Sequence, residues 1–224
     1  MIKAVIFDLY ETLITEFDPD YKANFSLEVD RSIFDQEWKK RKEKRMKGEF
    51  ADYKAAVRDI MKAIGQSITE TELNELHDKR VAKKTKPFAQ VHEDIIQMLE
   101  GIKDTGVRIG LISDCAVEEV AAWPDSALPP YFDEVTFSYQ AGIAKPNPEI
   151  YLRTCEKLDV QPSNAAFIGD GGSDELNGAF RAGLTPYQAT WFLDFWPNAE
   201  EKKKNRFRKV NRPLDVLHFV GMTR

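Results

Sequence analysis

An apolar run that ends in an acid constrains the fold of this chain most strongly. Val5, Ile6 and Phe7 are consecutive apolar residues that favour a strand, and Asp8 follows them directly. An uninterrupted run of this kind is typical of a strand buried on both faces of a parallel sheet. Open α/β sheets bind ligands in the crevice at the carboxyl ends of their strands. We therefore expect Asp8 at such a crevice, although a solvated acid at a strand end is the simpler alternative.

Two later segments repeat this arrangement of an apolar strand with a polar end. Residues 107–112 are followed by Ser113, and residues 164–169 are followed by Asp170. Acids on neighbouring loops, here Asp8 and Asp170, would form an oxygen-rich site of the kind that suits Mg²⁺. The Ser113 hydroxyl could donate to a phosphoryl oxygen, or it could simply cap the next helix.

The segment between residues 16 and 85 has helical rather than strand periodicity. The spacing of its apolar residues predicts three helices, at about 27–47, 51–64 and 69–83. Glu72 stands three residues after Thr69, which is the spacing of a capping box. We therefore expect a helical cap domain of residues 16–85, inserted into a core domain made of residues 1–15 and 86–224.

Basic residues are densest between positions 39 and 47, on the first predicted helix. A basic run on a long helix is usually a solvated face. Arg41 and Arg45 are four residues apart, so they share one face of that helix. If this face looks into the crevice, the pair could bind a phosphate or carboxylate of the substrate. Trp38, one turn earlier, is expected in the interior of the helical domain.

Four short motifs together resemble those of the haloacid dehalogenase superfamily. Residues 8–12 read Asp-Leu-Tyr-Glu-Thr and resemble motif I, Asp-x-(Asp or Tyr)-x-(Thr or Val). Ser113 stands where motif II has Ser or Thr. Lys145 lies in a Gly-x-x-Lys-Pro-x-Pro-x-Ile-Tyr run that resembles motif III.

The fourth motif, Gly-Asp-x(3 or 4)-(Asp or Glu), resembles the segment that begins at Gly169 and Asp170. Asp174 fills the shorter spacing and Glu175 the longer one, so both remain candidates for the second acid. The glycines that follow fit the family pattern better with Glu175.

The resemblance covers residues 8–175 and implies a fold, a chemistry and a cofactor. The fold is an α/β fold, a doubly wound and mostly parallel Rossmann-like sheet with an inserted helical cap. Asp8 would be the nucleophile and form an aspartyl intermediate that water hydrolyses. Thr12 would support the nucleophile loop, while Ser113 and Lys145 would hold phosphoryl oxygens. The implied Mg²⁺ ligands are Asp8, the Tyr10 carbonyl, Asp170 and Glu175.

One position departs from the phosphatase pattern. Phosphatases of the superfamily have an acid two residues after the nucleophile, where it protonates the leaving group, and this chain has Tyr10. The 2-haloacid dehalogenases also have Tyr there, but their motif IV resembles Ser-Ser-Asn and they need no metal. The sequence favours a Mg²⁺-dependent phosphatase of a small phosphorylated metabolite. A 2-haloacid dehalogenase, or a weakly active member that binds a phosphate ligand or a partner protein, remains open.

Composition limits the partners of the chain. The formal net charge of −5 argues against nucleic acid, whose phosphates favour a basic surface. We expect neither a membrane span nor a signal peptide, and hence a cytoplasmic protein with no membrane partner. Cys115 and Cys155 lack metal-ligand spacing and are expected to be reduced thiols. We expect a monomer or a homodimer, and the substrate's identity is left open.

Overall fold

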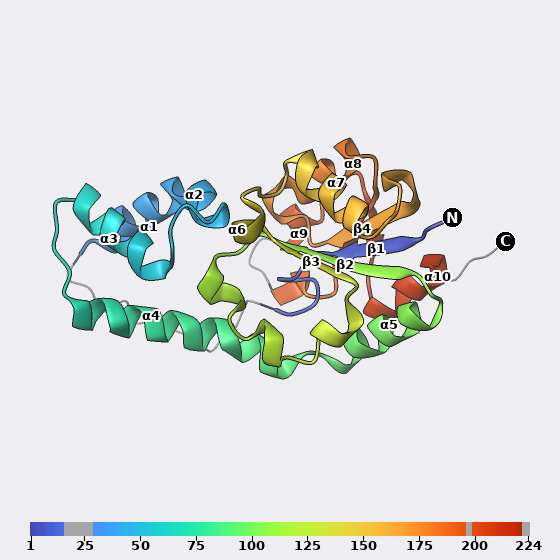
Figure 1. Ribbon diagram of the computed structural model, residues 1–224, viewed down its shortest axis with the longest axis horizontal. Coiled ribbons are helices and arrows are strands. Elements are labelled where there is room, and N and C mark those ends of the chain that lie inside the picture. Colours follow the sequence, from blue (N-terminus) through green and yellow to red (C-terminus); the bar gives the residue numbers. More distant parts are fainter. Residues whose placement is uncertain (16–28, 196–198, 221–224) are drawn as a thin grey trace.

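A parallel sheet with a lobe of helices beside it makes up the computed structural model, which describes residues 1–15, 29–195 and 199–220 (Figure 1). In this part of the chain the sheet has six strands, all parallel, in the order β3-β2-β1-β4-β5-β6. The strands are β1 (Ala4–Phe7), β2 (Arg108–Ser113), β3 (Glu134–Phe137), β4 (Ala165–Gly169), β5 (Thr185–Ala189) and β6 (Arg208–Val210). This order is that of a doubly wound Rossmann-like sheet, which confirms the predicted fold class.

The structure also contains α-helices. Their bounds are α1 (Arg31–Lys40), α2 (Lys42–Met46), α3 (Tyr53–Ala63), α4 (Glu70–Thr85), α5 (Glu93–Asp104), α6 (Ser138–Ala141), α7 (Pro148–Lys157), α8 (Glu175–Arg181), α9 (Ala199–Lys202) and α10 (Leu217–Val220). None of the helices in the described residues is long and apolar enough to cross a bilayer. Cys115 and Cys155 are buried and free.

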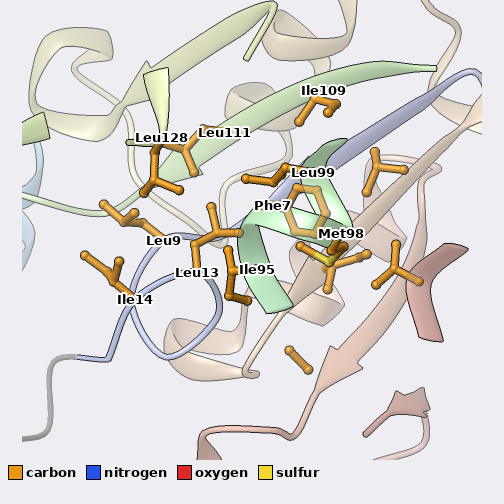
Figure 2. Packing of buried hydrophobic residues seen from close by; sticks show 14 of the residues in the cluster. Phe7, Leu9, Leu13, Ile14, Ile95, Met98, Leu99, Ile109, Leu111 and Leu128 are labelled. Carbon is orange, nitrogen blue, oxygen red and sulfur yellow. The ribbon is translucent and has the colours of Figure 1, made fainter. Parts of the chain in front are cut away.

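The central strand β1 is apolar throughout because helices cover both faces of the sheet. Val5 and Phe7 pack into the cluster formed with α5 and α10 (Figure 2). Ala4 and Ile6 point the other way, into the cluster formed with α7 and α8. All four side chains are fully buried. Each large apolar side chain buried in this way contributes about 1.5–3 kcal/mol, so the strand is firmly fixed.

The loop that leaves β1 is anchored by its own apolar side chains. Leu9, Leu13 and Ile14 are buried in the same cluster as Phe7, as Figure 2 shows. The Leu9 carbonyl accepts hydrogen bonds from the backbone N–H groups of Leu13 at 2.8 Å and Ile14 at 3.1 Å. This anchoring fixes the backbone on which the polar residues of motif I stand.

Helices α1 to α4 form the lobe beside the sheet, which we call the helical lobe. They enclose an apolar cluster of their own, made of Phe34, Tyr53, Val57, Ile60, Met61, Leu73 and Leu76. The capping box predicted at Thr69 and Glu72 is confirmed at the start of α4. Helix α4 runs from the lobe to the sheet and contacts the 3₁₀ helix η2 (Val117–Val120) (Figure 1).

The first predicted helix is interrupted in the structure. We expected one helix over residues 27–47, but α1 ends at Lys40 and α2 begins at Lys42. Between them Arg41 has φ −94° and ψ 4°, outside the α-helical region. The predicted start near residue 27 lies outside the described residues.

The outer edge of the sheet is a short strand in a charged part of the sequence. β6 pairs with β5 and contains Arg208 and Lys209. Both are exposed and only Val210 is buried, so this edge strand lacks an apolar run. Charged residues are common on edge strands because they discourage pairing with other chains.

We expect Gly48 to matter for the contact between the helical lobe and α6. Gly48 has φ +71°, and a Cβ there would lie 2.3 Å from the Tyr139 carbonyl oxygen. Gly65 has φ +70° with nothing within 4 Å, so it is a matched control. Gly65→Ala should cost about 1–2 kcal/mol of unfolding free energy for the left-handed backbone alone. Gly48→Ala should cost about 1–3 kcal/mol more because of the clash. Urea unfolding measures both, and equal losses would contradict this account.

Candidate active site

Three buried acids converge at the carboxyl ends of the two central strands. Asp8 follows β1, Asp170 follows β4, and Glu175 is the first residue of α8. β1 and β4 are neighbours, with Phe7 paired to Ile168, so the residues after them lie side by side. One carboxylate oxygen of each acid lies within 4.8 Å of the others. We call Asp8, Asp170 and Glu175 the acid group.

Lys145 lies against this acid group from the turn before α7. Its Nζ donates to the Asp8 carboxylate and, at 2.5 Å, to Oε2 of Glu175. Only 3% of its side chain is exposed. The backbone N–H of Lys145 donates to Oδ1 of Asp114 at 2.9 Å, which holds the turn in place. The lysine predicted from motif III is thus buried between two of the predicted acids.

Burial controls the charges in this group. It raises the pKa of Asp8 to about 6, an effect that Lys145 opposes and Asp170 strengthens. Burial also raises the pKa of Glu175 well above its ordinary value, and the nearby Asp8 adds to the shift. Burial alone would lower the pKa of Lys145, but Asp8 and Glu175 raise it well above its ordinary value. Lys145 therefore stays charged, and three ionised acids against one lysine would leave a net charge of −2.

Of the two candidate acids after β4, Glu175 is the one that lies in the site. The side chain of Asp174 is 52% exposed, whereas that of Glu175 is 1% exposed. Oε1 of Glu175 accepts a hydrogen bond from the Gly171 N–H at 3.0 Å. A Cβ on Gly169 would lie 2.2 Å from that same oxygen, so glycine is needed there. Glu175 therefore lies in the site and Asp174 does not.

The two predicted hydroxyl residues lie in different places: Thr12 is close to the Asp8 carboxylate, and Ser113 is at the end of β2, the strand beside β1. Oγ1 of Thr12 is 3.5 Å from Oδ2 of Asp8, which is long for a hydrogen bond. Ser113 ends β2, and its fully buried hydroxyl has no hydrogen-bond partner in the described part of the chain. The alternative that Ser113 caps the next helix is therefore wrong. Leaving a buried hydroxyl unpaired costs about 1–3 kcal/mol, so this oxygen is suited to a ligand.

A cavity of about 410 Å³ is lined by the acid group and by the helical lobe. From the sheet side it is lined by residues that include the acid group, Tyr10, Glu11, Asp114, Glu119 and Lys145. From the helical lobe it is lined by Trp38, Lys42, Arg45, Met46, Arg80 and Lys84. The lobe therefore contributes cations to a cavity whose floor is acidic.

The predicted pair of Arg41 and Arg45 does not line the cavity together. Arg41 donates to Glu37 at 2.5 Å and to Asp59 at 2.6 Å, and it is not among the cavity residues. Arg45 is buried and lines the cavity, with its guanidinium carbon 3.6 Å from the centre of the Trp38 ring. The two side chains therefore have different partners, although the backbone N–H of Arg45 still donates to the Arg41 carbonyl at 3.0 Å.

Tyr10 lines the cavity but its hydroxyl is directed to the backbone. It donates to the carbonyl oxygen of Glu119 at 2.6 Å. The Nζ atom of Lys84 lies 4.5 Å from the centre of the Tyr10 ring. The Tyr10 side chain thus connects the loop after β1 to η2.

Sequence reasoning missed an ion-pair network between α4 and η2. Arg80 donates to Glu118 at 3.0 Å and to Glu119 at 2.5 Å, and Lys84 lies 3.2 Å from Glu119. Burial by itself would raise the pKa of Glu119, but Lys84 and Arg80 lower it to about 2. The spacing of four between Arg80 and Lys84 places them on one helix face, but only the fold shows what that face meets.

Family comparison agrees with the site. A family model described as a haloacid dehalogenase-like hydrolase matches residues 2–183. This is most of the chain, so the protein belongs to the haloacid dehalogenase-like hydrolase family. The predicted family is confirmed, and with it an enzyme of the hydrolase class.

Two proteins are similar to this chain in sequence, and a dehalogenase is similar to it in fold. The chain is 26% identical over 147 residues to the glyceraldehyde 3-phosphate phosphatase of Methanopyrus kandleri, covering 64% of this chain and 60% of that enzyme. It is 28% identical to a Clostridium perfringens protein provisionally named pyrophosphatase PpaX, with 98% of each covered. The L-2-haloacid dehalogenase of Xanthobacter autotrophicus has the same fold, with a TM-score of 0.65, 20% identity and full coverage of both chains.

We expect the ion-pair network to stabilise the fold in a pH-dependent way. The pKa of Glu119 falls from an ordinary 4.5 to about 2, so its contribution is complete above about pH 4.5 and is lost as the pH falls towards 2. Glu119→Gln should lower the unfolding free energy by about 3 kcal/mol at neutral pH. The difference from the unmodified protein should shrink when urea unfolding is repeated towards about pH 3.

The matched control is Glu70→Gln, which breaks an exposed pair with Arg58. An exposed pair contributes about 0–1 kcal/mol, so this variant should change little. Equal losses in the two variants at neutral pH, or a Glu119→Gln effect that is constant down to about pH 3, would contradict the assignment.

Proposed function

We propose that this hydrolase is a Mg²⁺-dependent phosphatase of a small phosphorylated metabolite, with Asp8 as its nucleophile. The observation that carries the proposal is the acid group, in which three buried carboxylates face one lysine. A divalent cation would offset the net charge of −2 that three ionised acids and one lysine leave in such a site. The two relatives described above are both named for the hydrolysis of phosphate compounds, which supports this choice.

The donor set fits Mg²⁺. This ion prefers hard oxygen ligands, of which the protein supplies few and water and substrate supply the rest. Asp8, the Tyr10 carbonyl and Asp170 would hold it, with Glu175 beside them. When bound, Mg²⁺ would offset the repulsion between the acid group and an incoming phosphate.

The remaining chemistry follows from this chain's own residues. A carboxylate oxygen of Asp8 forms a bond to phosphorus, and the bond from phosphorus to the ester oxygen breaks. Lys145 balances the charge, and the unpaired hydroxyl of Ser113 is suited to donate to a phosphoryl oxygen. Thr12 lies beside the other oxygen of Asp8 and limits its orientation. Water then hydrolyses the aspartyl phosphate, which releases inorganic phosphate and restores Asp8.

The helical lobe is proposed to act as the cap over this site, within the predicted cap domain of residues 16–85. Its cavity residues include the cations Lys42, Arg45, Arg80 and Lys84. These charges would attract an anionic substrate, and the lobe would reduce the access of water to it.

A 2-haloacid dehalogenase is the second candidate, and Tyr10 is the observation that favours it. Halide departs without a proton, so such an enzyme needs no acid at this position. The Tyr10 hydroxyl already donates to the Glu119 carbonyl, so it is not directed to a leaving group. The same feature would make a phosphatase slow, which is also consistent with a weakly active member that binds a phosphate ligand or a partner protein.

The missing acid leads to a prediction about leaving groups. A well-placed general acid contributes about 10²–10⁴ in rate. We therefore expect a low kcat/KM on ethyl phosphate, whose alkoxide needs a proton, and a much higher one on p-nitrophenyl phosphate. Tyr10→Asp should narrow that gap by raising the rate on the alkyl ester more than on the aryl ester. Steady-state kinetics of both esters with Mg²⁺ measure this.

Two control variants separate the effect of an added acid at position 10 from the loss of the Tyr10 hydrogen bond and from the loss of Asp8. Tyr10→Phe loses the hydrogen bond to Glu119 without adding an acid, so it should leave the ratio between the two esters unchanged. Asp8→Asn should hydrolyse neither ester. Equal efficiency of the unmodified enzyme on both esters would show that another group supplies the proton, and activity of Asp8→Asn would refute its role as nucleophile.

A further inference from the structure

In the part of the chain that the structure describes, Arg45 is a buried cation without a carboxylate partner of its own. Its side chain belongs to a residue that is 7% exposed, yet its Nε has no hydrogen-bond partner in the described residues. One terminal nitrogen reaches only the Trp38 carbonyl oxygen, at 3.4 Å. An unpaired buried donor on a charged group is costly, so it is suited to a ligand.

Two neighbouring cations of the helical lobe, Arg80 and Lys84, are already paired with acids. Arg80 donates to both Glu118 and Glu119, and Lys84 pairs with Glu119. Burial lowers the pKa of Arg45 to about 10, and the charge of Arg80 adds to this, while Glu119 only partly opposes it. The cation is therefore incompletely compensated by the protein itself.

Arg45 and the acid group line the same cavity of about 410 Å³. Cavities that bind small ligands measure about 300–1,000 Å³, so this one suits a small molecule that touches both its floor and its roof. The Trp38 ring holds the guanidinium at a centroid distance of 3.6 Å, which limits its rotation. A planar guanidinium fixed in this way can bind two oxygens of one oxyanion.

We propose that Arg45 binds a second anionic group of the substrate, a carboxylate or a phosphate at the end away from the phosphate that is hydrolysed. The inference rests on the proposed phosphatase chemistry at Asp8 and deepens it by naming the substrate class. That class is small phosphate monoesters with an anionic tail, rather than those with a neutral tail.

A matched pair of substrates tests this without any variant. 3-Phosphoglycerate and glycerol 3-phosphate differ by a carboxylate in place of a hydroxymethyl group. The unmodified enzyme should prefer the former by about 10–100-fold in kcat/KM, the effect of one charge-assisted contact. Propane-1,3-diyl bisphosphate, tested beside them, shows whether phosphate serves better than carboxylate as the second anion. Equal efficiency on esters with neutral and anionic tails would overturn the proposal.

Substitutions in α2 test whether Arg45 causes the preference for an anionic tail. Arg45→Met should lose about 10–100-fold on 3-phosphoglycerate and less than about 3-fold on glycerol 3-phosphate. Arg45→Lys keeps the charge and should keep part of the preference, which also covers the case in which the Met variant does not fold. Lys44 is exposed on the same helix, so Lys44→Met removes an equal charge and should change neither ester. Equal losses on both esters in Arg45→Met, or the same pattern in Lys44→Met, would overturn the proposal.

A binding measurement tests the role of Arg45 independently of catalysis. Calorimetry with Asp8→Asn, in the presence of Mg²⁺, should show tighter binding of 3-phosphoglycerate than of glycerol 3-phosphate. The double variant Asp8→Asn with Arg45→Met should lose that difference. If the unmodified enzyme hydrolyses no phosphate ester, the proposed function fails while this binding comparison still decides the role of Arg45. Equal binding of the two compounds by Asp8→Asn would refute it.

Discussion

Three carboxylates removed from water beside a single lysine are the constraint on which the rest of this structure depends. Burying a charge costs several kcal/mol unless a partner compensates it, and losing one partner of a buried pair costs about 3–5 kcal/mol. Lys145 meets that requirement for Asp8 and Glu175, and its backbone is held by Asp114. The parallel neighbours β1 and β4 bring the acids together, while Gly169 leaves room for Glu175.

The contacts that hold the helical lobe against the sheet also form the wall of the cavity. Arg80 and Lys84 tie α4 to η2 through Glu119, whose backbone carbonyl accepts the hydrogen bond from Tyr10. Tyr10 belongs to the loop that carries the nucleophile candidate, so the lobe, η2 and motif I are joined in one network. Arg45 lines the same cavity, and among the described residues its Nε has no hydrogen-bond partner. The attachment of the lobe and the substrate contact proposed for Arg45 therefore involve the same cavity wall.

The sequence predicts what local pattern and strand topology determine. Apolar strands with polar ends located Asp8 and Asp170, because parallel strands end at one edge of a sheet. It could not predict β6, which has one buried residue, nor the break at Arg41, which has no proline or glycine. The ion pairs between α4 and η2 join residues that are separated by 38 and 39 positions in the sequence. Contacts between such distant residues leave no local signal in the sequence. In the basic run at 39–47 the lysines at 39, 40, 42 and 44 are exposed, as expected of a solvated face, and only the fold shows that Arg45 is buried.

The acid group favours a metal-dependent phosphatase over a dehalogenase. The most direct test offers metal-free enzyme a panel of phosphorylated metabolites, p-nitrophenyl phosphate and 2-chloropropionate, with and without Mg²⁺, and measures phosphate and chloride release. We predict phosphate release that requires Mg²⁺, is abolished by a chelator and is restored by added Mg²⁺, with no chloride release. Chloride release that is unaffected by the chelator, without phosphate release, would contradict the account.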